Sequence, residues 1–291
     1  MGEILSLTAA LAWAVGVILF RKIGETTSAV ALNLFKNVVT VALLVFALVL
    51  AGLPLFPDRP RSDWLLLAGS GVLGISLADT LFFLALERLG AGLVAVVDTL
   101  YSPSVIGLSV LFLGERFGLQ VLVGAALVVG AILTGSADRP PPGSTRRDIV
   151  VGTILGAAAM ICTACGIVMV KEMLGTVPVL WAAAVRMTFG VAGLLPLMLV
   201  PRWRSDAAAI FLPSRAWGLA IPASVLGSCL SMTAWLAGYK YTLASVAAVL
   251  NQLSTIFIVV LAAIFLKEPM TPRRTLAVAM AVTGAVLVTI R

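Results

Sequence analysis

The sequence has no histidine, only three cysteines, and a charged fraction of just 11%. Without histidine, the side chain that most often acts as a general base or metal ligand is missing. A soluble domain has roughly a quarter charged residues, well above this value. Hydrophobic residues make up 61% of the chain, and its mean hydropathy is +1.12. So much apolar surface requires lipid as its solvent, and we expect an integral membrane protein.

Further absences narrow the function classes. No P-loop or other nucleotide motif is present, which argues against direct drive by ATP. The net charge is +7, but Lys and Arg are spread over short segments between apolar runs, so we expect no nucleic-acid partner. Cys162 and Cys165 form a C-x-x-C outside any βαβ context, which favours small residues at a helix contact over a redox motif. We expect no metal site and no cofactor.

Ten apolar runs are long enough to cross a bilayer, whose hydrocarbon core needs about 20 residues of helix. The residues up to Phe20 lack a basic n-region and a small-residue cleavage site, so they resemble a first membrane helix more than a signal peptide. We therefore predict an all-α membrane protein with ten transmembrane helices. The runs are Ile4–Phe20, Val30–Ala51, Trp64–Leu86, Gly92–Leu113, Leu119–Gly135, Ile149–Val170, Pro178–Val200, Trp217–Tyr239, Ala244–Leu266 and Thr275–Ile290.

The most polar segment, residues 137–148, has five apolar runs on either side of it. It contains three consecutive prolines, Pro140 to Pro142, which cannot continue a helix. We predict a linker at 137–148 between a first five-helix repeat at 1–136 and a second at 149–291.

The two halves are similar in sequence. A shift of 150 aligns Gly16 with Gly166 and Lys36 with Arg186, and a shift of 153 aligns Trp64 with Trp217. From Trp64 to Glu115, 15 of 52 positions are identical at the second shift. Each half has an odd number of spans, so the second half enters the membrane from the opposite side. The sequence therefore predicts inverted repeats, the construction of carriers that bind substrate near the midplane and work by alternating access.

Residues at the expected fourth and fifth helices carry a family signature. The segment from Leu113-Gly114-Glu115-Arg116 to Gly124-Ala125-Ala126, together with the weaker copy at Leu266-Lys267-Glu268-Pro269 and Gly284-Ala285, resembles EamA-type transporters of the drug/metabolite transporter superfamily. The resemblance covers nearly the whole chain. It implies a ten-helix secondary carrier. In the second copy the Gly before Glu268 is missing and Pro269 follows it.

Four ionisable residues lie well inside the apolar runs: Lys36, Asp79, Asp98 and Arg186. An ionisable side chain in the bilayer costs about 2.5–3.5 kcal/mol on insertion scales, so it normally faces a cavity or a partner. We expect these residues to line a central cavity with neighbouring polar and aromatic residues. The predicted substrate-binding set is Trp13, Asn33, Lys36, Asn37, Asp79, Asp98, Tyr101, Arg186, Trp235, Asn251 and Gln252.

These side chains suggest separate tasks. Lys36 or Arg186 would bind a carboxylate or phosphate, and Arg offers a bidentate fork. Asp79 or Asp98 would bind an ammonium group or carry a coupling proton. The alternative is that Lys36–Asp98 and Arg186–Asp79 are internal ion pairs that fix packing.

We predict a secondary transporter, not an enzyme, that exports or exchanges an amino acid or related charged metabolite. The alternatives are a lipid flippase or scramblase on the same fold, which needs a cavity open to lipid, and a membrane-embedded enzyme, for which no nucleophile–base set is found. The expected partners are a small-molecule substrate, the lipid bilayer and protons. The expected location is the plasma membrane, as a multi-pass protein of a bacterial inner membrane. The Lys/Arg bias of the loops places the termini outside, whereas the resemblance implies termini inside.

Overall fold

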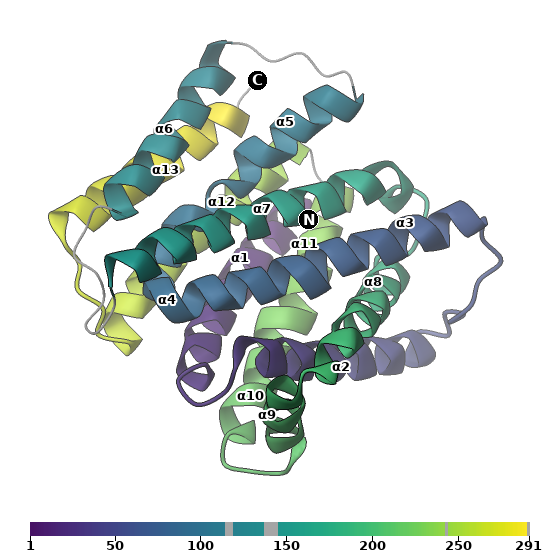
Figure 1. Cartoon of the computed structure of the whole chain (residues 1–291). Helices are drawn as coiled ribbons and strands as arrows, with labels where there is room; N and C mark the ends of the chain where they lie inside the picture. The colour runs from purple at the N-terminus through teal and green to yellow at the C-terminus, as the bar shows by residue number, and fades with distance from the viewer. Residues whose placement is uncertain (114–118, 137–144, 242–243, 290–291) are drawn as a thin grey trace.

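A computed structural model describes residues 1–113, 119–136, 145–241 and 244–289, and every regular element in these ranges is helical (Figure 1). The elements are α1 (Gly2–Ile23), α2 (Ala29–Leu50), α3 (Arg61–Gly71), η1 (Val72–Leu77), α4 (Ala78–Asp98), α5 (Tyr101–Leu113), α6 (Leu119–Ser136), α7 (Arg146–Leu174), α8 (Val179–Leu194), η2 (Leu195–Leu199), α9 (Pro201–Phe211), α10 (Trp217–Ser224), η3 (Val225–Leu230), α11 (Ser231–Tyr241), α12 (Ala244–Phe265) and α13 (Pro272–Thr289).

Six helical stretches within the described residues are long and apolar enough to cross a membrane. They are Gly2–Ile23, Ala29–Leu50, Arg61–Asp98, Arg146–Leu174, Val179–Leu199 and Trp217–Tyr241. A shorter apolar helix runs over Leu250–Phe265. The predicted all-α membrane class is therefore confirmed for the part of the chain that the structure describes. The predicted Pro-rich linker lies mostly outside the described residues, and α7 begins at Arg146, behind a capping box of Thr145 and Asp148.

The long stretch from α3 to α4 bends sharply at Gly90, the boundary expected between two predicted spans. Gly90 has φ +72°, a left-handed conformation that residues with a side chain rarely adopt. The next predicted span, Gly92–Leu113, is not one helix, because α4 ends at Asp98 and α5 begins at Tyr101. Pro103 explains this break, since it has no N–H to donate to the Thr99 carbonyl one turn earlier.

One described helix was not expected from the sequence. The predicted span Pro178–Val200 consists of α8 followed by the 3₁₀ turn η2, and the loop after it contains α9. This short helix buries Ala207 and Ile210 and packs against α2, where the rings of Phe35 and Phe211 lie 5.2 Å apart. The sequence did not predict α9, because its arginines are exposed and its apolar face is too short to form a run that could span a membrane.

Equivalent positions of the two halves make equivalent contacts. The π-helical turns η1 and η3 are related by the shift of 153 that aligns the sequences. Gly16 of α1 lies against Gly227 of η3, and its counterpart Gly166 of α7 lies against Ser70 and Gly74 at α3 and η1. Each contact joins a helix of one half to the π-helical turn region of the other half.

The helices interlock across the two halves. In Figure 1, α6 and α13 run side by side at one edge of the molecule, and α7 lies along α4. α1 packs on α11 and α12, so the first helix of the chain contacts helices close to the C-terminal end of the chain. The four ionisable residues of the apolar runs lie on α2, α4 and α8, and α2 packs against both α4 and α8.

Candidate functional site: a charge-lined central cavity

A cavity of about 150 Å³ lies between helices of both halves. A single water needs roughly 10–15 Å³ measured in the same way, so a small metabolite has room here. Nine of the predicted residues line the cavity: Trp13, Lys36, Asp79, Asp98, Tyr101, Arg186, Trp235, Asn251 and Gln252. Asn33 and Asn37 do not line it. They are fully buried behind Lys36.

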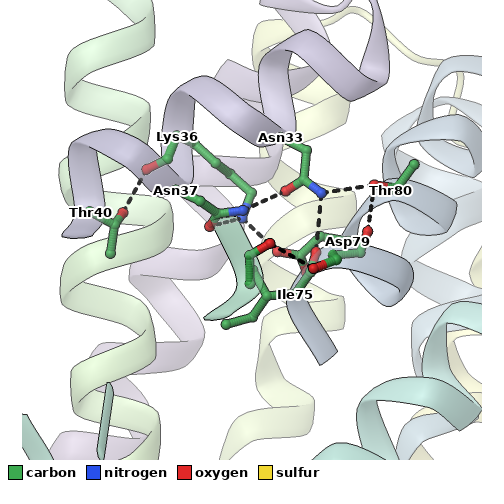
Figure 2. A network of polar contacts seen from close by, with 9 residues as sticks. Asn33, Lys36, Asn37, Thr40, Ile75, Asp79 and Thr80 are labelled. Atoms are coloured by element: carbon green, nitrogen blue, oxygen red, sulfur yellow. Dashed lines mark hydrogen bonds and ion pairs between the residues drawn. The ribbon is translucent and has the colours of Figure 1, made fainter. Parts of the chain in front are cut away.

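Lys36 and Asp79 form a close ion pair at one side of the cavity (Figure 2). The Lys36 ammonium lies 2.6 Å from Asp79 Oδ2 and also donates to Asn37 Oδ1 at 3.0 Å. The Lys36 side chain is 2% exposed, and its ammonium lies 5.5 Å from the centre of the Phe83 ring. Within the described residues, the positive charge of Lys36 is therefore balanced by Asp79.

A network of amides and hydroxyls holds this pair in place (Figure 2). Asn37 donates to Asn33 Oδ1 at 2.7 Å, and Asn33 donates to Thr80 Oγ1 at 2.9 Å and to the carbonyl of Ile75 at 3.1 Å. Ile75 belongs to the π-helical turn η1, and such turns occur often at functional sites. Asn33 thus fixes α2 against η1 and α4, and Asn37 links Asn33 to Lys36 along α2.

The ion pairs that the sequence suggested as an alternative are wrong. Lys36 pairs with Asp79 and not with Asp98, and no described acidic group lies within 4.0 Å of Arg186. Spacing along each helix could not choose among these pairings, because the choice depends on how η1 and α4 face α2. Lys36 and Asp79, both of the first half, form one pair, and Arg186 and Asp98 have no ion-pair partner among the described residues.

Arg186 faces the cavity as a buried cation. Its side chain on α8 is 1% exposed, and its Nε and Nη1 have no hydrogen-bond partner among the described residues. The guanidinium carbon lies 5.8 Å from the Trp235 ring, a cation–π distance. A buried guanidinium with free donors is costly without an acceptor, so the geometry fits an anionic group arriving in the cavity.

Asp98 lies in the same cavity at the end of α4, directly before the break that precedes α5. It makes no hydrogen bond or ion pair within the part of the chain that the structure describes. Its carboxyl group is therefore available to a ligand. The helix break brings Tyr101 into the cavity as well, with its ring 6.3 Å from that of Trp235.

Neutral polar groups and aromatic rings complete the lining. Gln252 donates to Ser102 at 2.7 Å, which leaves its buried Oε1 without a partner among the described residues, and Asn251 Nδ2 is likewise unpartnered there. Trp13 packs on Phe82 with ring centres 5.3 Å apart, and Trp235 packs on Tyr239 at 5.4 Å. The cavity thus combines hydrogen-bonding groups with broad apolar walls.

Sequence analysis missed several lining residues, among them Met160, Thr163, Met232, Phe82 and Ser254. The repeat itself carried the signal that finds them, because each is the counterpart in the other half of another lining residue. The aligned pairs in the lining are Ala10/Met160, Trp13/Thr163, Lys36/Arg186, Gly74/Gly227, Asp79/Met232, Phe82/Trp235, Asp98/Asn251 and Tyr101/Ser254.

The cavity has no obvious place for a metal ion. Among the described residues, no group of three or more Cys, Asp or Glu side chains is arranged to hold one. Cys162, Cys165 and Cys229 are free thiols.

Long apolar helices around a charge-lined cavity define a polytopic membrane protein with an internal polar site. The model of the EamA-like transporter family matches the chain twice, over residues 1–136 and 150–290. The protein therefore belongs to the EamA-like transporter family, which consists of membrane transporters and not enzymes. This confirms the resemblance found in the sequence to the drug/metabolite transporter superfamily.

Other comparisons support the fold alone. A solved structure, titled only as the crystal structure of a protein, matches with a TM-score of 0.72. It is 17% identical in sequence, and the match covers 98% of this chain and 94% of that one. No curated protein matches the chain.

Proposed function

We propose that the protein is a secondary transporter built from ten transmembrane helices in two inverted five-helix repeats, and that it works by alternating access. The lining of the cavity supports this arrangement, because most of its residues fall into pairs that the sequence repeat aligns. A two-fold axis through the cavity would place both members of each pair around one substrate. Carriers of this construction expose such a site to each side in turn by rocking one repeat against the other.

We propose that the substrate is an amino acid or a closely related zwitterionic metabolite. The single observation that carries this proposal is the pair of free opposite charges, Arg186 and Asp98, that face one cavity. Arg186 would bind the carboxylate through a bidentate fork, and Asp98 would bind the ammonium group. Lys36 and Asp79 already neutralise each other, so a ligand of zero net charge matches what remains.

The neutral groups of the cavity would orient such a ligand. Gln252 Oε1 and Asn251 Nδ2 supply one free acceptor and one free donor beside the charged groups. Trp13 and Trp235 would cover the apolar part of the substrate. Asn33 and Asn37 would act indirectly, by holding Lys36 against Asp79.

Asp98 is also the better candidate for proton coupling. Asp79 is engaged by the Lys36 ammonium at 2.6 Å, whereas Asp98 has no such partner among the described residues. A carboxylate that binds either the substrate ammonium or a proton exchanges one for the other. That competition is the simplest way for this cavity to couple export of a substrate to entry of protons.

Uptake into proteoliposomes tests the proposal. The purified chain would be assayed against a panel of radiolabelled amino acids, amines, sugar phosphates and nucleotides, with and without a pH gradient. We expect saturable uptake of zwitterions. Unlabelled amino acids should inhibit this uptake, whereas simple amines and phosphates should not. Uptake confined to phosphorylated compounds would contradict the assignment of Asp98. Movement of fluorescent lipid between leaflets without any soluble substrate would favour the scramblase alternative.

A further inference from the structure

The carboxylate of Glu268 reaches from the connection between α12 and α13 to the bend in α4. Its Oε1 accepts a hydrogen bond from the backbone N–H of Ala91 at 2.8 Å, and its Oε2 accepts one from Gly92 at 3.0 Å. These two N–H groups belong to the first turn of the helical segment that resumes after Gly90, where no intrahelical acceptor is available. Glu268 therefore caps this segment from another part of the chain.

Two glycines make room for this contact. A side chain on Gly90 would begin 2.8 Å from Glu268 Oε1, and Gly90 also has the left-handed φ of +72°. A side chain on Gly92 would begin 2.8 Å from the guanidinium carbon of Arg274. The backbone at the bend thus has the conformation and the open space that the carboxylate requires.

Arg274 of α13 fixes the carboxylate from the other side. Its Nη1 lies 3.1 Å from Glu268 Oε2 and donates to the carbonyl of Pro269 at 3.0 Å. The Arg274 side chain is 5% exposed, so this ion pair is shielded from water. The two residues together join the start of α13 to the bend in α4.

The capped segment carries a residue of the cavity. Residues 91–98 form about two turns of helix, and the segment ends at Asp98 immediately before the break that precedes α5. A short segment that is free at both ends has little stability of its own. Residues 91–97 are buried against neighbouring helices, and the contacts of Glu268 hold the first turn of the segment, so both fix the position of the Asp98 carboxylate.

The sequence provides this full set of residues at only one of the two positions that the repeat relates. Glu268 is the counterpart of Glu115, but the counterpart of Gly90 is Leu243 and that of Arg274 is Val121. The same half-specific pattern holds inside the cavity, where the counterpart of Asp98 is Asn251. Gly90 before the capped segment, Asp98 at its end and Arg274 of α13 thus have no equivalents at the related position.

We propose that Glu268 is a positioning residue that clamps residues 91–98 and thereby holds Asp98 in the cavity. The effect on transport rests on the function proposed above, whereas the clamp itself rests on the contacts of Glu268. Oxygen acceptors and negative charge are both required, because the carboxylate receives two N–H groups and one guanidinium. Neither arginine nor alanine at position 268 can replace it.

Hydrogen exchange and transport together test the clamp. Backbone exchange in peptides covering residues 88–100 would be followed by mass spectrometry in wild type, Glu268→Gln, Glu268→Ala, Arg274→Gln and the exchanged pair Glu268→Arg/Arg274→Glu. We expect exchange in this segment to rise about tenfold or more in Glu268→Ala and less in Glu268→Gln, which keeps one acceptor. Hydrogen exchange in the exchanged pair should be as fast as in Glu268→Ala, because an arginine cannot accept hydrogen bonds from the N–H groups of Ala91 and Gly92.

Several outcomes would overturn the proposal. Unchanged hydrogen exchange in Glu268→Ala would exclude a clamp. Full protection of the segment in the double variant Glu268→Arg/Arg274→Glu would show that an ion pair alone holds it. With a transported substrate in hand, Glu268→Gln should raise the KM about tenfold with a smaller change in maximal rate, and an unchanged KM would refute the positioning of Asp98. Glu25→Ala, an exposed acidic residue after α1, is the matched control and should change neither readout. If the substrate panel shows no transport, the exchange result still decides the clamp.

Discussion

The two halves of the molecule each bring one buried cation to the cavity, but the two cations are used differently. Lys36 in the first half lies 2.6 Å from Asp79 and is held by buried amides. Its counterpart Arg186 in the second half is equally buried and has two guanidinium nitrogens without partners among the described residues. The two halves thus place a cation at equivalent positions, but only the first half provides it with an acidic partner among the described residues.

The difference follows from a few substitutions between the halves. The counterpart of Asp79 is Met232, which cannot pair with Arg186, and the counterpart of Asn33 is Ala183, which cannot extend a hydrogen-bond network. The first half thus has the residues to bury its own charge. The second half keeps its charge available, which is what a binding site requires. We infer that Lys36 mainly stabilises the fold and that Arg186 mainly binds substrate.

The largest expected effect is on the stability of the paired side. Asp79→Ala should lower the free energy of unfolding by about 3–5 kcal/mol, because it leaves the buried Lys36 ammonium without a counter-charge. Unfolding in mixed micelles, followed by tryptophan fluorescence, measures this. The double variant Lys36→Met/Asp79→Leu should recover most of the loss, because it removes both charges together.

Asp63→Ala is the control for this comparison. It removes a partner from the pair of Arg59 and Asp63, which lie 4.0 Å apart with their side chains partly exposed, and should cost less than about 1 kcal/mol. Equal losses of unfolding free energy in Asp63→Ala and Asp79→Ala would show that the Lys36–Asp79 pair stabilises the fold no more than a partly exposed pair does.

Arg186→Met should have the opposite profile. Two charge-assisted hydrogen bonds to a carboxylate contribute about 1.5–3 kcal/mol each, so uptake should fall by at least about 100-fold. Stability should be unchanged or higher, because the variant removes a buried charge that has no partner among the described residues. Arg186→Lys keeps the charge without the fork and should lie between the two. Retained uptake in Arg186→Met would show that Arg186 does not bind the carboxylate of the substrate.

Much of this site was predictable because membrane burial makes ionisable residues conspicuous. Lys36, Asp79, Asp98 and Arg186 stand out in apolar runs, and all four line the cavity. Their pairing was not predictable, since it depends on the rotation of η1 and α4 against α2. The sequence suggested Lys36–Asp98 and Arg186–Asp79 as the alternative, and the structure has Lys36–Asp79.

Other features needed the three-dimensional arrangement. Glu268 lies between α12 and α13, and it accepts hydrogen bonds from Ala91 and Gly92, which are far away in the chain. The α9 helix was missed because it is short and has exposed arginines. By contrast, Thr163 and Met160 were within reach of sequence analysis, since shifting Trp13 and Ala10 by the repeat length identifies them. Glu115 lies outside the described residues.

Asp98→Asn sharpens the same comparison on the acidic side. We expect it to abolish uptake driven by a pH gradient while substrate exchange continues at a reduced rate, because the amide can still accept a hydrogen bond but cannot bind a proton. Asp79→Asn should not show this split, since Asp79 is engaged by Lys36. The measurement compares gradient-driven uptake with counterflow in the same vesicles. Gradient-driven uptake by Asp98→Asn at the wild-type rate would exclude Asp98 as the coupling group.

The smallest expected effect concerns the scaffold contacts that the halves share. A side chain on Gly16 would overlap the backbone of Gly227, whereas one on its counterpart Gly166 would begin 3.2 Å from the Ser70 carbonyl oxygen. Gly16→Ala should therefore cost about 1–3 kcal/mol, and Gly166→Ala should cost less, since a shift of a few tenths of an ångström relieves it. Gly218→Ala, with open space around it, should be neutral or slightly stabilising in its helix. Unfolding in mixed micelles ranks the three. Equal costs at Gly16 and Gly166 would mean that the two inter-half contacts are equally tight, and that the halves differ in their charges alone.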